Sequence, residues 1–116
     1  MRAYIEQGAV GGVVVQGGPF FYERGEQFGA LEAKFGMPAI FTFRDITTTG
    51  GLMSYGINIA EMFRLVGIYA GRTLMGDKPA DLPVQVPTKF ELVINLKTAR
   101  TLGLTLPPSI LIRPTM

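Results

Sequence analysis

The chain has 116 residues with a formal net charge of +2, and it contains no His, Cys or Trp. The lack of Cys excludes disulfides and thiolate metal sites, and the lack of His excludes the Ser/His/Asp triad and most zinc chemistry. A net charge this small gives no reason to expect a nucleic-acid partner. The length corresponds to one domain, which can bury a core without cross-links.

Two features of the composition are unusual. Charged residues make up 17% of the chain, and 15 residues are Gly, whereas soluble domains carry about 25% charged residues. So few charges predict that the protein hides more surface than its own core needs, either as an oligomer or as part of a larger body. An ordinary α/β domain with a rich core is the alternative explanation.

The first section, residues 1–48, is predicted to form a β-α-β unit. Residues 1–7 look like the end of a helix, and the β-branched run at 11–16 is typical of a strand covered on both faces. Apolar residues recur at helical spacing over 22–35, and 38–43 is the next strand. The short connections favour a right-handed parallel arrangement of the two strands.

The second section, residues 49–76, is predicted to contain a strand and an apolar helix. A TTTGG loop at 47–51 precedes a short strand at 52–54. Asn58, with Glu61 three residues later, resembles a capping box that starts a helix running to about Met75.

This predicted helix is apolar nearly all round, which indicates burial on several sides. Gly67 and Gly71 permit close approach of another backbone. In a soluble chain that spacing reflects plain packing more often than a dimer motif. Both interpretations stay open at this point.

The third section, residues 77–116, begins with a Pro-rich extended connection that reaches Pro87. A strand follows at 89–94, and Asn95 is placed to cap a short helix that Gly103 closes. Further prolines leave the tail extended, namely Pro107, Pro108 and Pro114.

The sequence contains no apolar run of the 18 or more residues that a membrane span needs, so no membrane insertion is expected. The first residues are not expected to form a signal peptide, because Arg2 is followed by Glu6 and a Gly-rich strand. The chain as given is therefore expected to be cytoplasmic, or periplasmic if it is a fragment of a longer exported protein.

The Gly-rich start does not indicate a nucleotide site. It lacks the G-x-G-x-x-G spacing between strand and helix and the Gly-Lys-Ser/Thr of a P-loop. Among the acidic residues, Asp45 alone follows the end of a predicted strand, where open α/β sheets place ligand groups. It has no evident acid/base partner, and a loop cap or a pair with Arg44 explains it equally well. We therefore expect no enzyme, no cofactor and no metal site.

Three loops are expected to converge if the sheet is parallel: 17–21, 43–45 and 50–58. They offer backbone N–H groups, aromatic walls and polar side chains, which suit a small polar ligand with an apolar part. For each aromatic residue alone, core packing remains the alternative. The candidate ligand-binding residues are Gly18, Pro19, Phe20, Arg44, Asp45, Ser54, Tyr55, Gly56 and Asn58.

Several long segments resemble the C-terminal portion of ABC-transporter substrate-binding proteins of the tryptophan/tyrosine-binding-like type. They are GGLMSYG (50–56), GDKPADLPV (76–84), PTKFELVINLKTA (87–99) and LGLTLPPS (102–109), with VVVQGGPFF (13–21) and MPAIF (37–41) upstream. The resemblance implies a truncated lobe of a type I periplasmic-binding-protein-like fold, an α/β lobe of three layers with a parallel sheet. In that fold a ligand is held between two lobes that close on a hinge.

The resemblance also implies partners. They are a small amino-acid-like ligand and, if the chain is part of a longer protein, an ABC permease. Because this portion lacks half of the cleft, its apolar helix would be exposed in a monomer. We therefore expect a homo-oligomer, a dimer with exchange of residues 50–75 as one route. A structural domain that only self-associates and binds no ligand is the alternative function.

Overall fold

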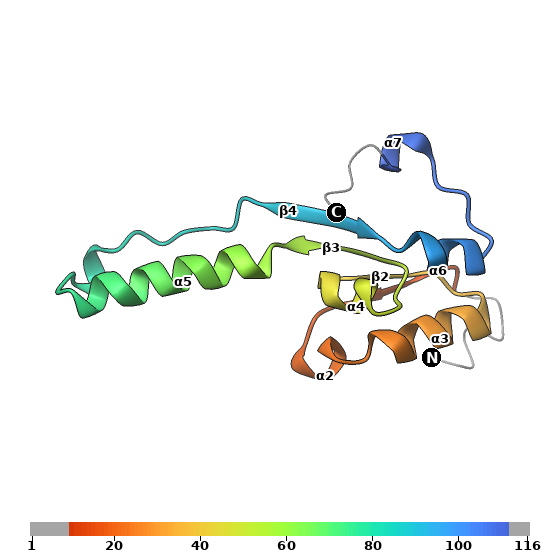
Figure 1. The fold of residues 1–116 in the computed structure, drawn as a ribbon, viewed down its shortest axis with the longest axis horizontal. Coiled ribbons are helices and arrows are strands. Elements are labelled where there is room, and N and C mark those ends of the chain that lie inside the picture. Colours follow the sequence, from red (N-terminus) through yellow and green to blue (C-terminus); the bar gives the residue numbers. More distant parts are fainter. Residues whose placement is uncertain (1–9, 112–116) are drawn as a thin grey trace. The chain divides into compact units, whose positions relative to one another are not determined.

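The structure is a computed structural model that describes residues 10–111, shown in Figure 1. The chain divides into two compact units: one contains the residues up to Gly56 and those from Glu91 onward, and the other is Ile57–Phe90. Each unit is described by itself below. The helix end expected at 1–7 lies outside the described residues.

The described residues form a four-stranded sheet with the strand order β1-β2-β3-β4. Strand β2 pairs in parallel with both β1 and β3. Two backbone hydrogen bonds, from Asn95 N to Leu52 O and from Asn58 N to Lys89 O, fix β4 as antiparallel to β3. The α/β class is confirmed, but the sheet is mixed rather than wholly parallel. The strands are β1 Val13–Val15, β2 Ala39–Phe41, β3 Met53–Ile57 and β4 Phe90–Ile94.

Helices of the first unit lie between and after these strands. The helix expected at 22–35 is divided in two, because Pro19 starts a separate short helix and Glu23 and Arg24 join it to the next one. Gly36 ends the second helix with φ of 58°, a left-handed conformation that favours glycine. The helices are α2 Pro19–Tyr22, α3 Gly25–Phe35, α4 Arg44–Thr48, α6 Leu96–Thr101 and α7 Pro108–Leu111.

Two of these helices, α4 and α7, form where the sequence predicts no helix. Helix α4 takes in residues that were expected to begin a loop at 47–51, and the hydroxyls of Thr48 and Thr49 donate to the carbonyl of Asp45 at 3.0 and 2.8 Å. Helix α7 lies in the tail that was expected to be extended, because Pro108 at its first position fits the start of a helix.

The core of the first unit lies on β2. Ala39 and Phe41 are buried there together with Ile46 of α4, and the ring of Phe28 of α3 lies at a tilt to that of Phe41, with centroids 5.1 Å apart. Val14 of β1 is 79% exposed, so the expectation that this strand is covered on both faces is wrong. Its position at the edge of the sheet order and the alternating burial of β1 explain the exposure.

Side chains at the start of α6 form hydrogen bonds that join the segment after β4 to the segment before β3. Asn95 accepts from the backbone N–H of Thr98, as expected for a helix cap, and donates through Nδ2 to Thr47 O at 3.0 Å. The hydroxyl of Thr98 donates to Gly50 O at 2.8 Å. Gly29 of α3 lies so close to Gly50 that a Cβ there would be 2.4 Å from its carbonyl oxygen.

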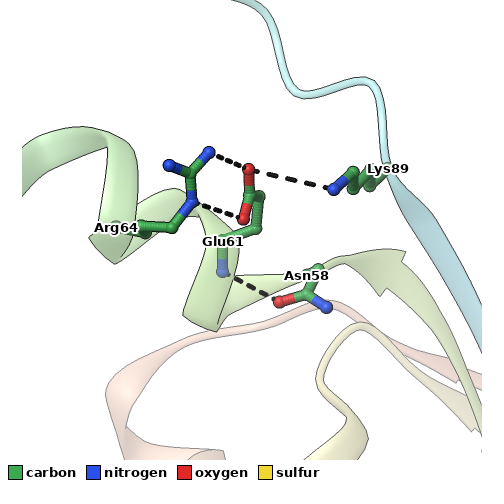
Figure 2. Close-up of polar contacts among 4 residues, drawn as sticks. All are labelled: Asn58, Glu61, Arg64 and Lys89. Atoms are coloured by element: carbon green, nitrogen blue, oxygen red, sulfur yellow. Dashed lines mark hydrogen bonds and ion pairs between the residues drawn. The ribbon is translucent and has the colours of Figure 1, made fainter. Parts of the chain in front are cut away.

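The second unit consists of α5, Ile59–Leu74, the short helix η1, Pro79–Asp81, and an extended segment that reaches residue 89. Asn58 caps α5 by accepting from the N–H of Glu61 at 2.9 Å, as the sequence predicts (Figure 2). No residue of α5 is buried by the described chain. The predicted burial on several sides is therefore absent in the single chain.

Candidate functional site

The carboxyl ends of β1 and β2 bring two of the expected loops together. The backbone N–H of Gly17 donates to the hydroxyl of Thr42 at 3.2 Å. A Cβ on Gly17 would be 2.3 Å from the ring of Phe43, and a Cβ on Gly56 would be 2.1 Å from Thr42 O. Glycine at both positions therefore lets the carboxyl ends of β1, β2 and β3 approach closely.

Helix α2 presents an aromatic platform at this edge of the sheet. The ring of Phe20 is 66% exposed and meets Phe21 edge to face, with centroids 5.3 Å apart. The guanidinium of Arg24 lies 4.1 Å from the centroid of the Phe20 ring, and its Nε donates to Phe20 O at 3.0 Å. The platform therefore has an apolar surface with a positive charge beside it.

A second aromatic residue of α2 faces the loop after β2. The ring of Tyr22 lies at a tilt to that of Phe43, with centroids 5.2 Å apart. A hydrogen bond to the carboxylate of Asp45, together with partial burial and the charge of Asp45, raises the pKa of the Tyr22 hydroxyl. Asp45 is thus in contact with Tyr22 of α2, and the pairing with Arg44 considered in the sequence analysis is replaced by this contact.

Arg44 instead pairs with Glu91 of β4, with Nη1 and Oε2 3.5 Å apart. The two side chains are 45% and 15% exposed, so the pair lies near the surface and contributes on the order of 1 kcal/mol or less. Sequence reasoning missed Tyr22, Arg24 and Glu91 at this site. The aromatic run PFFY signals Tyr22, and the contact of Arg24 with Phe20 is local, four residues apart. The contact of Glu91 with Arg44 joins distant segments, which the sequence does not encode locally.

The third expected loop is divided by β3. Residues 50–52 precede this strand and lie at its amino end, opposite the carboxyl ends of β1 and β2, because β3 is parallel to β2. The prediction that all three loops converge is therefore wrong for residues 50–52. Ser54 is 1% exposed within the sheet, whereas the ring of Tyr55 is 56% exposed.

The structure thus brings Gly18, Pro19, Phe20 and Asp45 to one edge of the first unit. Gly56 supports that edge by its contact with Thr42. Asn58 belongs to the second unit, where it caps α5 and donates its backbone N–H to Lys89 O at 3.2 Å.

The second unit has an apolar groove of its own, with a volume of about 910 Å³. It runs between α5 and the extended segment after η1, and the hydroxyl of Tyr69 donates to Pro83 O across it. At one end, Glu61 receives two hydrogen bonds from Arg64 and lies 3.9 Å from Nζ of Lys89 (Figure 2). Arg64 is the main cause that holds the pKa of Glu61 below its usual value.

None of the described helices combines the length and the apolar character that crossing a bilayer requires.

Three solved structures resemble the chain in fold. A conserved domain protein from Vibrio cholerae O1 biovar El Tor is 24% identical, with a TM-score of 0.84 over 98% of this chain and 38% of the other. The ABC domain in complex with L-Trp from Streptococcus pneumonia is 26% identical, with a TM-score of 0.82 over 96% and 38%. CD0873, a substrate binding protein with adhesive properties from Clostridium difficile, is 20% identical, with a TM-score of 0.60 over 93% and 39%.

The chain thus spans less than two fifths of the length of the solved structures that it matches. A search of curated proteins found no significant relative. The family of ABC transporter substrate binding proteins matches residues 30–116, well over half of the chain. The strand–helix–strand pattern, the mixed sheet and the sequence match agree, and the chain belongs to the ABC transporter substrate-binding protein family as a partial member.

Proposed function

We propose that this chain contributes one wall of a binding site for a small amino-acid-like ligand. The observation that carries the proposal is the exposed Phe20 ring with the Arg24 guanidinium 4.1 Å from its centroid, at the carboxyl edge of β1 and β2. An aromatic or aliphatic side chain would pack on the ring, and the cation would attract a carboxylate. The Streptococcus pneumonia domain in complex with L-Trp supports an amino acid as the ligand class.

The proposed wall combines side chains and backbone. Exposed Tyr55 would add a second aromatic surface, and the backbone of Gly18 and Pro19 would bound the site. We also propose that the sections 1–48, 49–76 and 77–116 act as one partial domain. The residues of the first unit that we propose to line or support the site are Gly18, Pro19, Phe20, Arg44, Asp45, Ser54, Tyr55 and Gly56, whereas Asn58 caps α5 in the second unit.

Ligand binding is tested by titrating L-Trp and L-Leu into ¹⁵N-labelled protein, with glucose as a chemically unrelated control. We expect chemical-shift changes at the amides of Gly17 and Gly18, with a millimolar Kd because a single wall makes few contacts. The variant Phe20→Ala should lose these changes. The matched control is Phe63→Ala, since Phe63 is also 66% exposed but lies in the other unit. Absence of any change at 10 mM amino acid would contradict the proposal.

In a longer protein, the same wall would serve delivery to an ABC permease. Substrate-binding proteins of ABC transporters capture solutes outside the cytoplasmic membrane, and we propose that compartment for the activity. Transport is tested by restoring the complete protein in a strain that depends on it for amino-acid uptake. Loss of uptake on Phe20→Ala is the expected result.

A second candidate function is self-association, and the exposure of α5 favours it. The second unit leaves large apolar side chains in solvent, with Phe63 at 66%, Leu74 at 88% and Val84 at 96% exposed. Soluble monomers rarely present such contiguous apolar surface. Light scattering at micromolar concentration is expected to give the mass of a dimer, and a monomer at every concentration would contradict this candidate.

A further inference from the structure

A buried carboxyl group lies under the segment that leads into β3. Glu32 of α3 is 4% exposed, and both of its carboxylate oxygens are enclosed without a hydrogen-bond partner among the described residues. The backbone N–H groups of Ala39, at the start of β2, and of Leu52, just before β3, approach the carboxylate. Because the described chain itself encloses both oxygens, neither solvent nor another chain packed on the surface reaches them.

Residues 50–52, here called the 50–52 segment, lie between α3 and the start of α6. On the α3 side, a Cβ added to Gly29, about one turn before the buried carboxyl group, would be 2.4 Å from Gly50 O. On the other side, the backbone N–H of Asn95 donates to Leu52 O at 2.8 Å. Contacts this close leave no room for water, so the segment has to move before water reaches the carboxylate.

Among the described residues, no charged side chain compensates a negative charge at Glu32. Burial is the main cause that raises its pKa to about 7, and the two backbone N–H groups are the only groups that lower it. Helices α4 and α6 pack against α3. The charged residues of these three helices are Glu26, Glu32 and Lys34 of α3, Arg44 and Asp45 of α4, and Lys97 and Arg100 of α6.

Those charged side chains are engaged elsewhere or exposed. Arg44 pairs with Glu91, and Asp45 is in contact with Tyr22. The charged side chains of α6, and the other two of α3, are exposed. Ionisation of Glu32 in the closed structure therefore leaves an enclosed charge without a counter-charge, which is far less stable than the same carboxylate in water.

The 50–52 segment is the part of this enclosure that belongs to no helix or strand, since α4 ends at Thr48 and β3 begins at Met53. Its displacement breaks fewer backbone hydrogen bonds than unfolding of α3 or β2. We propose that Glu32 makes the 50–52 segment a pH-dependent latch: the neutral carboxyl group allows the segment to close on α3, and loss of the proton to solvent opens it. Because the segment runs directly into β3, the latch acts on the strand that carries Tyr55.

Hydrogen exchange of the native protein measures the latch. The reporters are the amides of Gly51, which donates to Ile46 O at 2.9 Å, and of Asn95, whereas Phe41, 2% exposed in the core, reports global unfolding. Between pH 5 and pH 8 the protection of both reporters, corrected for intrinsic exchange rates, should fall about 70-fold, because the open form releases its proton near pH 4.5 and the closed form near pH 7. Both reporters should exchange faster than Phe41 and with little dependence on low concentrations of urea, which is the mark of a local opening.

Two Gln variants on α3 separate the effect of the charge from that of the packing. Glu32→Gln keeps the size of the side chain, so both reporters should stay protected from pH 5 to pH 8. Glu26→Gln, an exposed change on the same helix, is the control and should behave as the wild type does. A fall in protection that persists in Glu32→Gln overturns the latch.

Two measurements on the wild-type protein can also overturn the latch. If the reporters and Phe41 exchange at the same rate and with the same dependence on urea, only global unfolding exposes Glu32, and no local opening exists. A ¹³C titration of the Glu32 carboxyl group should give a midpoint of about 7. A midpoint near the ordinary value of 4.5 would show that the closed structure tolerates the charge, and it would overturn the proposal without any variant.

Discussion

Replacing Glu32 with Gln is expected to make the first unit more stable at neutral and alkaline pH. Glu32 lies on α3 and is 4% exposed, and neither carboxylate oxygen has a hydrogen-bond partner among the described residues. Burial raises the pKa of Glu32 to about 7 from its ordinary 4.5. The backbone N–H groups of Leu52 and Ala39 approach the carboxylate without full hydrogen-bond geometry, and they offset only part of the cost.

The direction of the pH dependence follows from the number of protons that the folded and unfolded states bind. Between pH 4.5 and about 7 the folded state binds a proton at Glu32 that the unfolded state has released. The free energy of unfolding therefore falls as pH rises through this window and levels off above it. The raised pKa of Glu32 lowers the free energy of unfolding by roughly 3 kcal/mol over the whole window, at 1.36 kcal/mol for each unit of pKa.

Urea unfolding followed by circular dichroism, at intervals from pH 4.5 to pH 8, measures this dependence. Glu32→Gln should match the wild type near pH 4.5 and exceed it by about 2–3 kcal/mol at pH 8. Glu26→Gln, an exposed change on the same helix, is the control and should follow the wild type. Equal pH dependence in the wild type and Glu32→Gln would refute the assignment of the buried charge.

Two further substitutions test the packing around α3 and α6. Gly29→Ala should destabilise by about 1–3 kcal/mol, although helix propensity alone would stabilise, because the new Cβ meets Gly50 O at 2.4 Å. An increased midpoint in urea would contradict this close approach. Asn95→Ala should cost about 1–2 kcal/mol, because α6 loses its cap and Thr47 O loses its donor. Asn95→Asp keeps the oxygen that caps α6 but loses the N–H donor. Its midpoint of thermal unfolding should therefore lie between those of the wild type and Asn95→Ala.

Local signals in the sequence predicted where two helices begin. Asn58 and Asn95 cap α5 and α6 through their side-chain oxygens, as expected. In each case the residue acts on backbone groups within three or four positions. The physical cause is therefore contained in a short stretch of sequence.

Contacts between distant segments could not be predicted in the same way. The TTTGG segment has weak helix formers, yet α4 forms there while Thr47 is buried and Asn95 binds its carbonyl from 48 residues away. The partners of Asp45 and Arg44 likewise come from other elements, α2 and β4. The antiparallel direction of β4 decides which side chains it brings to the site, and hydrophobic periodicity does not encode strand direction.

The apolar character of α5 is a further case in which the sequence does not identify a contact partner. Its composition predicts burial on several sides, but the described chain buries none of its residues. Periodicity identifies a face that should be covered and does not identify the molecule that covers it.

Phe20 and Phe63 allow the two proposals to be tested independently. Both rings are 66% exposed, and they lie in different units of the chain. Truncation of either to Ala removes a similar apolar area, so a non-specific effect on solubility or stability should be alike in the two variants. If the ligand wall and the exposed face of α5 are separate, Phe20→Ala loses the amino-acid-induced shifts and keeps the dimer, and Phe63→Ala does the reverse. Loss of both properties in both variants would show that binding and self-association share one surface.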